Sequence, residues 1–596
     1  MAVYTQGKLV GVVSFKQIFP NVEMPALENL LNGLSRVWAV RLISNIHNKL
    51  VGKPFYNPEY KGEKTSQIDV PRFFFGPDNE KVLYDVISRY NVYLTEERMD
   101  GALPMVCAAG DETPLIMLKY IMAMPESQAS DDIPYLEKSL FVAFMVANGI
   151  TMNREFGDSP YKQISDLELN IASLLMTRYA YNDFTNIKSD LDNQMRNQLS
   201  RTVSFFKFVS KHPLLKDLYE EFLREYKLQS WGNYLKTYWS LQVLANYNTG
   251  FVNFKILEDK DNLLSEPVVE KDSIDIHQII PLSENVDYVA FREKPFIKIA
   301  PHEYAIIDVS FLINRMYDGL YFSFNKLWQN KHPDNKNEFN RIFTTEFSEE
   351  TVLVNNLKDV ANTQRWFSLT DKECKDLISE HKIPSPPDFY IRDGKNIILF
   401  ECKDVKIRKD IKENGTIELL LKEINKGFVG YEDEKKKWKY KGVGQLVRNA
   451  KRIQDGNFRW DPEVDSESKI FLVLVVADPK QVAPGWKNYL NRKMQEECVR
   501  QNVNMSRIYP LILTDLGTIA LYKHNFKGKG LIQYFNQYFQ KTKFDAKVLS
   551  SLSDEDKMTA IMNQTMSFSS YMNGEKIMNG EEFGKSILNA MVEQTS

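Results

Sequence analysis

Two acidic residues and a lysine stand where two predicted strands meet, within SPPDFYIRDGKNIILFECKDVKI (385–407). Asp388 opens a β-like run, an Asp393-Gly394 turn follows, and residues 396–404 form a second, strongly apolar run. Asp-Gly between two such runs is a strong β-hairpin signal. Because side chains alternate along a strand, Glu401 and Lys403 project from one face. The sequence therefore predicts a hairpin that brings Asp388, Glu401 and Lys403 together.

These side chains suit the hydrolysis of a phosphodiester. The reaction needs hydroxide near neutral pH and stabilisation of a pentacoordinate phosphorus centre, and a divalent cation held by carboxylate oxygens supplies both. Asp388 and Glu401 are the expected ligands, and the backbone carbonyl of Cys402 is a third. Lys403 would orient the attacking water or offset developing charge. An all-oxygen site favours Mg²⁺ or Mn²⁺ over zinc.

The E-x-K pattern alone carries little information, because it occurs nine times in the chain. Glu373-Cys374-Lys375-Asp376 even repeats the tetrapeptide that begins at Glu401, but it lies in a polar, helix-like stretch. Only the copy at Glu401 ends a buried strand and follows a Pro-Asp strand across a tight turn. For this hairpin the ordinary alternative is a surface salt bridge at its end.

With Pro387-Asp388 and Glu401-Cys402-Lys403, residues 340–540 resemble the PD-(D/E)xK nuclease superfamily, which includes restriction endonucleases and Holliday junction resolvases. The resemblance implies a core of helix, three antiparallel strands, helix and strand. Residues 442–454 are expected to form the later helix, and residues 468–478 and 506–515 to form further strands. A third strand is expected within residues 404–440, which also hold an insertion.

The resemblance also implies further site residues. Members often carry a glutamine on the helix after the motif, here Gln445, and a glutamate on the helix before it, here Glu349 with Glu350 as second choice. Arg448 and Arg452 share a helix face with Gln445 and are expected to contact nucleic-acid phosphates, although such a face is also ordinary solvated surface. Basic and aromatic residues of the insertion are expected to bind DNA through charge and through stacking: Lys436, Lys437 and Trp438.

Charge and composition agree with a soluble, cytoplasmic protein without a membrane span. The net charge is only −3, yet residues 403–452 hold fifteen Lys or Arg against eight Asp or Glu. Such a local strip matters more for binding a polyanion than the charge of the whole chain. Four scattered cysteines predict no disulfide framework, and no apolar run approaches the roughly 20 residues of a membrane span.

The whole chain is predicted to be multidomain, α/β and α. Its ranges are a mixed α/β region (1–125), a helical region (126–258), a mixed connector (276–335), the nuclease domain with a restriction-endonuclease-like α/β core (336–545) and a helical tail (546–596). An acidic, Pro-containing stretch at residues 259–275 is the expected linker.

The predicted function is that of a Mg²⁺- or Mn²⁺-dependent endonuclease or exonuclease acting on DNA. Asp388, Glu401, Lys403 and Gln445 would be its catalytic residues. The architecture resembles that of bacterial anti-phage defence and restriction proteins, an analogy that does not rest on residues. Alternative functions that the sequence leaves open are an RNA-cleaving nuclease, a nucleic-acid-binding or assembly subunit with a nuclease-like scaffold, and a metal-dependent phosphatidate or nucleotide hydrolase. A homodimer and a partner defence subunit are the possible protein partners.

Overall fold

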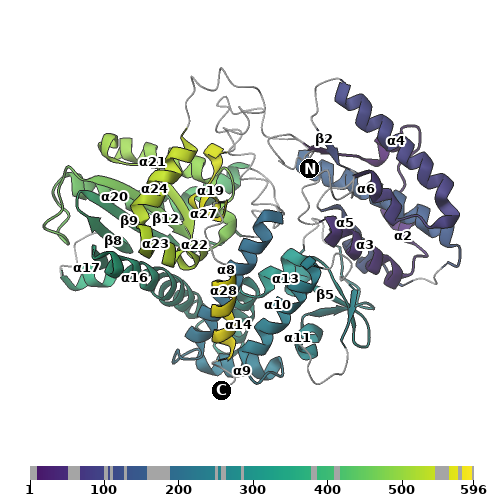
Figure 1. Cartoon of the computed structure of the whole chain (residues 1–596), viewed down its shortest axis with the longest axis horizontal. Helices are drawn as coiled ribbons and strands as arrows, with labels where there is room; N and C mark the ends of the chain where they lie inside the picture. The colour runs from purple at the N-terminus through teal and green to yellow at the C-terminus, as the bar shows by residue number, and fades with distance from the viewer. Residues whose placement is uncertain are drawn as a thin grey trace.

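The chain folds into a mixed α/β structure in which helices surround several separate sheets (Figure 1). The computed structural model describes residues 10–50, 67–99, 105–107, 112–126, 130–156, 188–247, 253–256, 264–282, 288–377, 385–408, 417–543, 563–574 and 580–592. Within these ranges no helix is both long enough and apolar enough to cross a membrane.

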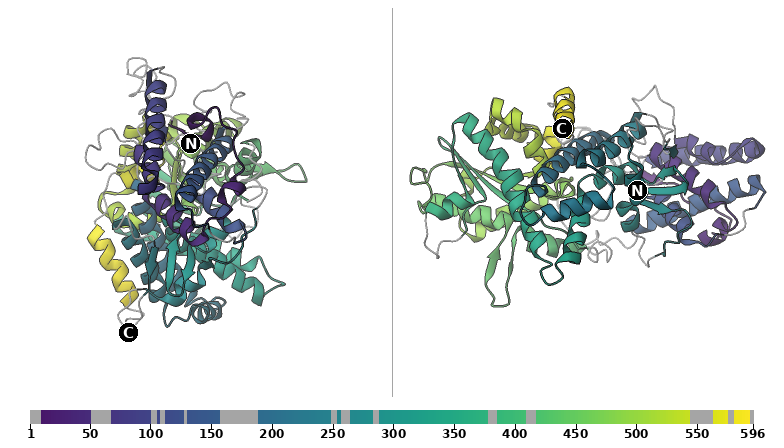
Figure 2. Two further views of the ribbon diagram at one scale, coloured as in Figure 1. Left: turned by 90° about the vertical axis from the view of Figure 1, so that its right-hand side faces the viewer. Right: turned by 90° about the horizontal axis from the view of Figure 1, so that it is seen from below.

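An N-terminal lobe of helices lies at the opposite end of the molecule from the largest sheet (Figure 2). Helix α6 is apolar on most of its surface, as expected of a helix that is buried among others. The elements of this lobe are β1 (Val10–Val12), α1 (Phe15–Ile18), α2 (Leu27–Leu31), α3 (Arg36–Leu50), η1 (Gln67–Phe73), η2 (Pro77–Asn79), α4 (Glu80–Met99), β2 (Met105–Cys107), α5 (Thr113–Ala123) and α6 (Ile133–Phe156).

A four-stranded sheet in the order β3-β6-β5-β4 separates the lobe from the middle of the molecule. Its strands are β3 (Asn253–Lys255), β4 (Ser273–Asp275), β5 (Phe296–Ala300) and β6 (Glu303–Ile306). Ile297 and Ala305 pack into the core of the N-terminal lobe, whereas Phe296 and Ile306 pack into the next core along the chain. The two-residue alternation of strands thus gives the sheet two apolar faces.

The middle of the molecule is helical and rich in buried aromatic rings. Its elements are α8 (Lys188–Val209), α9 (Lys216–Glu225), α10 (Trp231–Tyr247), α11 (Glu266–Lys271), α12 (Val289–Glu293), α13 (Val309–Arg315), α14 (Asp318–Lys331), α15 (Glu338–Arg341), the π-helix η4 (Ile342–Val354) and α16 (Asn355–Gln364). Arg315 forms a buried, two-pronged ion pair with Asp272, with both N–O distances 3.0 Å, and Tyr226 donates to the same carboxylate over 2.8 Å.

The largest sheet has five strands in the order β13-β12-β9-β8-β7. β7, β8 and β9 form an antiparallel meander, and β12 runs parallel to both β9 and β13. The strands are β7 (Phe367–Thr370), β8 (Phe389–Asp393), β9 (Asn396–Lys403), β12 (Lys469–Val476) and β13 (Ile512–Asp515). The strand predicted at residues 468–478 is confirmed as β12, and the one at 506–515 is confirmed over its last four residues.

Both faces of this sheet are buried. Ile397 and Leu399 of β9 pack with α20 (Gly442–Gln454) and α21 (Trp486–Arg500), whereas Ile398 and Phe400 pack into the core of the middle helices. That second face is also covered by α22 (Leu516–Leu521), α23 (Lys523–Lys529), α24 (Leu531–Thr542) and α27 (Phe568–Gly574), while the C-terminal helix α28 (Gly580–Val592) packs on α8 and α10. The predicted alternation along β9 and the predicted helix at 442–454 are both confirmed.

Three predictions about local structure need correction. The third strand of the meander is β7, which precedes the β8–β9 hairpin and does not follow it. The described part of residues 404–440 instead holds α19 (Ile417–Phe428) and a separate two-stranded hairpin, β10 (Gly430–Glu432) and β11 (Trp438–Tyr440). The short apolar run at residues 286–291 also predicts a strand, and this prediction is wrong where the run is described, since α12 begins at Val289. The stretch 259–275 is not a linker from Glu266 on, because it forms α11 and β4.

The cores also divide the chain differently from the predicted ranges. Helix α6 falls in the predicted helical region, but it shares a core with the N-terminal helices. Helices α8 to α10 and the C-terminal α27 and α28 share a core with one face of the five-stranded sheet. Leu167, Ile171 and Leu174, whose three- and four-residue spacing predicts a helix, lie outside the described residues.

The buried ion pair gives a direct test of the middle core. Arg315→Ala should lower the free energy of unfolding by about 3–5 kcal/mol, because it leaves the Asp272 carboxylate buried without its cation. Urea denaturation followed by circular dichroism measures this loss. Arg341→Ala removes an exposed ion pair with Glu338 and should leave the midpoint nearly unchanged. Equal urea midpoints for Arg315→Ala and the wild-type protein would contradict a stabilising role for the Arg315–Asp272 ion pair.

Candidate active site

The β8–β9 hairpin sets the register of the candidate site. Asp393 pairs with Asn396 across a two-residue turn, in which Gly394 has φ +58°, a conformation that glycine adopts without strain. Phe389 then pairs with Phe400, and Asp388 N–H donates to the Phe400 carbonyl over 3.1 Å. The next position along the ladder places Asp388 opposite Glu401. Side chains in such positions are direct neighbours on one face of a sheet.

Asp388 is held in place by the backbone of the neighbouring strand. The Cys402 N–H donates a hydrogen bond of 2.6 Å to Asp388 Oδ2. Burial raises the pKa of the Asp388 carboxyl, although the Lys403 ammonium and this hydrogen bond oppose the rise. One oxygen of Asp388 is therefore fixed at the end of β9, next to Glu401. The metal contact of the Cys402 carbonyl stays a prediction.

Glu401 is fully buried, and only one of its two carboxylate oxygens has a hydrogen-bond partner among the described residues. Its Oε1 accepts a hydrogen bond of 2.6 Å from Lys403 Nζ, whereas its Oε2 is buried with no hydrogen-bond partner among the described residues. Burial, together with the charges of Asp388 and Glu349, raises the pKa of Glu401 to about 8. Burial disfavours the charged form of Lys403, but the Glu401 and Asp388 carboxylates outweigh it and raise the pKa of Lys403. An unpaired, buried carboxylate oxygen is a site that a cation would satisfy.

Of the two glutamates predicted on the preceding helix, Glu349 belongs to this cluster. It is half-buried on η4, whereas Glu350 is exposed. Burial and the charge of Asp388 raise the pKa of Glu349 to about 8, and Lys403 opposes them. Within the ranges the structure describes, however, no three Asp, Glu, His or Cys side chains lie close enough to hold a metal together. Metal binding by Asp388, Glu401 and Glu349 stays a prediction.

Two residues near the site were missed from the sequence, Asp371 and Lys375 of α17 (Asp371–Leu377). The Asp371 N–H donates to the Asp388 carbonyl over 3.2 Å, and the Asp371 carboxylate forms an ion pair with Lys375. The charge of Asp371 raises the pKa of both Asp388 and Glu349. The signal that could have found them is the capping box at the start of α17.

That capping box also explains the second copy of the tetrapeptide. Thr370 N–H donates to Glu373 Oε2 over 2.9 Å, and Glu373 N–H donates to Thr370 Oγ1 over 3.1 Å. Glu373 also pairs with Lys358. The prediction that this copy lies on a helix is confirmed, and its glutamate is used to begin that helix.

Helix α20 begins above the end of β9. Leu474 pairs with Glu401 across the sheet, and a side chain on Gly442 would come within 3.3 Å of Leu474. Gly442 has φ +38°, and added side chains there and at Gly444 would strike the backbone carbonyls of Phe428 and Val429 at 2.6 and 2.3 Å. Glycine is thus required for this close approach.

Gln445 and Arg448 open into a cavity of about 300 Å³ beside the β10–β11 hairpin. Gln445 Oε1 accepts a hydrogen bond of 3.0 Å from Gly442 N–H, and the Arg448 guanidinium lies 4.9 Å from the ring centre of Tyr440. The cavity is lined by cations and aromatic rings together with two neutral polar residues: Ser385, Tyr431, Trp438, Lys439, Tyr440, Lys441, Gln445 and Arg448. The structure thus brings together the predicted Gln445, Arg448 and Trp438.

The other predicted nucleic-acid contacts lie elsewhere. Arg452 donates to Asn449 Oδ1 over 2.8 Å and lies 5.5 Å from the ring centre of Trp460. Burial and the charge of Arg448 lower the pKa of Arg452 to about 10, so its environment is that of a packed residue, and the predicted phosphate contact has no support here. Lys436 and Lys437 are exposed in the turn between β10 and β11.

Comparisons with known proteins found no relationship. A scan against protein-family models, a search of curated proteins and a search of solved structures each returned no match to this chain. The geometry of the site therefore has to be weighed by itself.

The buried carboxylates predict a pH-dependent response to divalent cations. A pKa raised from 4.5 to about 8 means that folded Glu401 keeps a proton that the unfolded chain loses. In EDTA, stability should therefore fall as the pH rises from about 5 to about 8, by an amount on the order of a few kcal/mol. Mn²⁺ should raise the melting temperature more at pH 8 than at pH 6, because it binds the ionised carboxylates.

Thermal denaturation of the wild-type protein beside Glu401→Gln checks this response. The variant should show a smaller fall with pH, because only the contribution of Glu349 is left, and should lose the effect of Mn²⁺. Glu350→Gln, which alters an exposed neighbour of the cluster, should keep both. The same Mn²⁺ response in Glu401→Gln and in the wild-type protein would count against a cation at this position.

Proposed function

We propose that this protein is a metal-dependent nuclease that hydrolyses phosphodiester bonds in DNA. The observation that carries the proposal is the pair of half-buried Asp388 and fully buried Glu401, in which Lys403 bonds one oxygen of Glu401 and the other has no partner among the described residues. Two carboxylates and an ammonium in one buried place are costly to maintain for stability alone. Such strongly shifted groups are typical of functional sites.

The order of elements supports the same proposal. A helix (η4 and α16), the antiparallel meander β7-β8-β9, helix α20 and the parallel strand β12 follow one another along the chain. This is the order that the resemblance to PD-(D/E)xK nucleases implies, with β7 rather than a later segment as the third strand of the meander. The carboxylates and Lys403 lie at the end of β9, beside the start of β8.

Each side chain has a distinct role in the proposed reaction. Asp388 and Glu401 would hold a Mg²⁺ or Mn²⁺ ion, whose charge polarises the phosphoryl oxygen and lowers the pKa of bound water. Lys403 would keep its proton throughout, because its raised pKa leaves it charged at neutral pH, and would orient the attacking water or offset charge at phosphorus. Glu349 would raise the negative potential around the pair and so favour a cation.

The cavity beside α20 supports a nucleic acid as substrate. Lys439, Lys441 and Arg448 offer cations to phosphates, and Trp438 and Tyr440 offer rings on which bases stack. These contacts serve RNA as well as DNA, so RNA is the alternative substrate. A role in bacterial anti-phage defence or restriction is part of the proposal by analogy of architecture alone.

A second candidate function is a DNA-binding subunit whose nuclease-like domain is a scaffold. It is favoured by the direct Lys403–Glu401 contact and by the lack of a third acidic ligand within the described residues. This candidate predicts binding without cleavage.

Cleavage assays separate the two candidates. Wild-type protein with Mg²⁺ or Mn²⁺ should cut plasmid DNA, and Asp388→Asn and Lys403→Ala should each reduce the rate about 100-fold or more, because each removes charge stabilisation at the reacting phosphate. Lys395→Ala, at the exposed far end of the same hairpin, should cut as the wild type does. Gel-shift measurements in EDTA should show that all variants still bind DNA.

Two results would contradict the nuclease. One is plasmid binding by the wild-type protein with no cleavage under either cation, which would favour the scaffold. The other is cleavage that persists in both site variants. Running the assay on single-stranded DNA and RNA in parallel identifies the substrate.

A further inference from the structure

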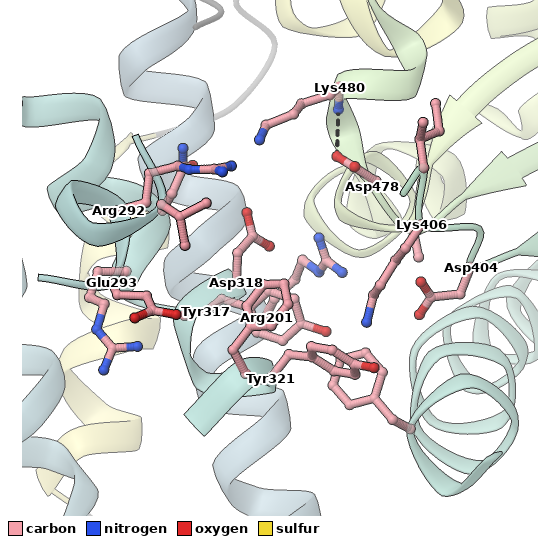
Figure 3. A pocket seen from close by; sticks show the side chains of 18 residues that line it. Arg201, Arg292, Glu293, Tyr317, Asp318, Tyr321, Asp404, Lys406, Asp478 and Lys480 are labelled. Carbon is pink, nitrogen blue, oxygen red and sulfur yellow. Dashed lines mark hydrogen bonds between the residues drawn. The ribbon is translucent and has the colours of Figure 1, made fainter. Parts of the chain in front are cut away.

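A second cavity, of about 390 Å³, lies where the middle helices meet the five-stranded sheet (Figure 3). Lys406 and Asp404 enter it from the segment after β9, Arg292 and Glu293 enter from the opposite side, and Arg201 of α8 lies between them. This cavity is separate from the one beside Gln445, because no residue lines both. Its volume is in the range of sites for small molecules, about 300–1,000 Å³.

Two cations of the cavity have no acidic partner within the described part of the chain. Arg201 is 4% exposed, its guanidinium lies 4.0 Å from the ring centre of Tyr317, and its Nε has no hydrogen-bond partner there. Lys406 is open to the cavity and lies against the ring of Tyr321. Burial lowers the pKa of Lys406 to about 8 even though Asp404, Asp318 and Asp478 oppose the change. Of the two, only Arg201 is buried, and although burial lowers the pKa of its guanidinium, Tyr317, Asp318 and Asp404 together outweigh this effect and raise the pKa. Arg201 forms no ion pair with a carboxylate among the described residues, so an added anion would stabilise it further.

Three of the acidic residues that line the cavity accept hydrogen bonds from other groups, while Asp318 and Asp404 also attract Arg201 and Lys406 electrostatically. Asp318 accepts from the Gln198 amide over 3.0 Å, and Asp404 accepts from Ser348 Oγ over 3.3 Å. Asp478 accepts from the Lys480 N–H over 3.0 Å. Each carboxylate keeps further lone pairs, so it can accept hydrogen bonds from hydroxyl or amino groups.

The remaining wall of the cavity is aromatic. Tyr321 and Phe343 are buried, whereas the ring of Phe322 is 60% exposed. Exposed aromatic rings beside unpaired cations fit a ligand with both a flat ring and a negative charge. The carboxylates fit the hydroxyl and amino groups of such a ligand.

We propose that this cavity binds a free nucleotide. The phosphate would lie against Arg201 and Lys406, the base against the exposed ring of Phe322, and the sugar hydroxyls or base amino group near Asp318 and Asp404. The volume fits one nucleotide rather than a strand.

The cavity also touches the segments that carry the candidate active site. Asp404 follows Lys403 directly, and its partner Ser348 precedes Glu349. A ligand that contacts Asp404 and Lys406 would therefore act on both segments. This coupling rests on the proposed nuclease function, whereas the binding of the nucleotide does not.

Calorimetric titration of the full chain tests the binding. ATP, ADP and AMP should be compared with adenosine and with inorganic phosphate, and at least one nucleotide should bind more than tenfold tighter than either fragment. Lys406→Ala and Phe322→Ala should each weaken binding at least tenfold, since each removes one of the two recognised features. Lys395→Ala and Tyr84→Ala, which alter matched exposed side chains elsewhere, should bind as the wild type does.

Three results would overturn the proposal: no binding of any nucleotide, binding that neither cavity variant weakens, and binding that appears only with a 5′-phosphorylated oligonucleotide. Binding of the oligonucleotide alone would mean that the cavity holds part of the nucleic-acid substrate and not a free nucleotide. Repeating the titration with Asp388→Asn separates this proposal from the nuclease, because nucleotide binding should persist when cleavage is lost.

Discussion

The structure of the candidate site depends on one backbone constraint, the antiparallel pairing of β8 with β9 across the Asp393-Gly394 turn. This pairing places Asp388 opposite Glu401, and the Cys402 N–H holds the Asp388 carboxylate there. A shift of the register by one residue would turn Glu401 and Lys403 to the opposite face. Because both faces of β9 are buried in separate cores, the register is fixed by packing as well as by the turn.

Burial then gives the site its electrostatic character. Three carboxyl groups gather where water is scarce, and Lys403, a backbone donor and the more distant charge of Lys375 compensate them in part. The pKa values of Glu401 and Glu349 therefore rise to about 8. Helix η4, which carries Glu349, also contributes Phe343 to the wall of the cavity that holds Arg201 and Lys406. The two sites thus share supporting elements.

The local features of the domain could be predicted from the sequence, and the distant ones could not. The hairpin, β9, α20 and β12 follow from a turn signal and from strong two- and 3.6-residue periodicity, which act over short distances. β7 was missed because four residues with an exposed first position carry little pattern. Asp371, the packing of Arg452 on Trp460 and the approach of Arg201 to Lys406 depend on tertiary contacts, which no local pattern encodes. The sharing of one core by α8, α10 and the C-terminal helices is of the same kind.

The central claim is that Asp388 and Glu401 share one divalent cation. Anomalous diffraction from crystals soaked in Mn²⁺ tests it most directly, because the manganese signal locates the ion independently of the protein atoms. We expect a single strong peak within about 2.5 Å of a carboxylate oxygen of both Asp388 and Glu401, with Lys403 moved off Glu401 Oε1. A fully soaked crystal with no peak at these carboxylates, and with the Lys403–Glu401 bond intact, would contradict the account.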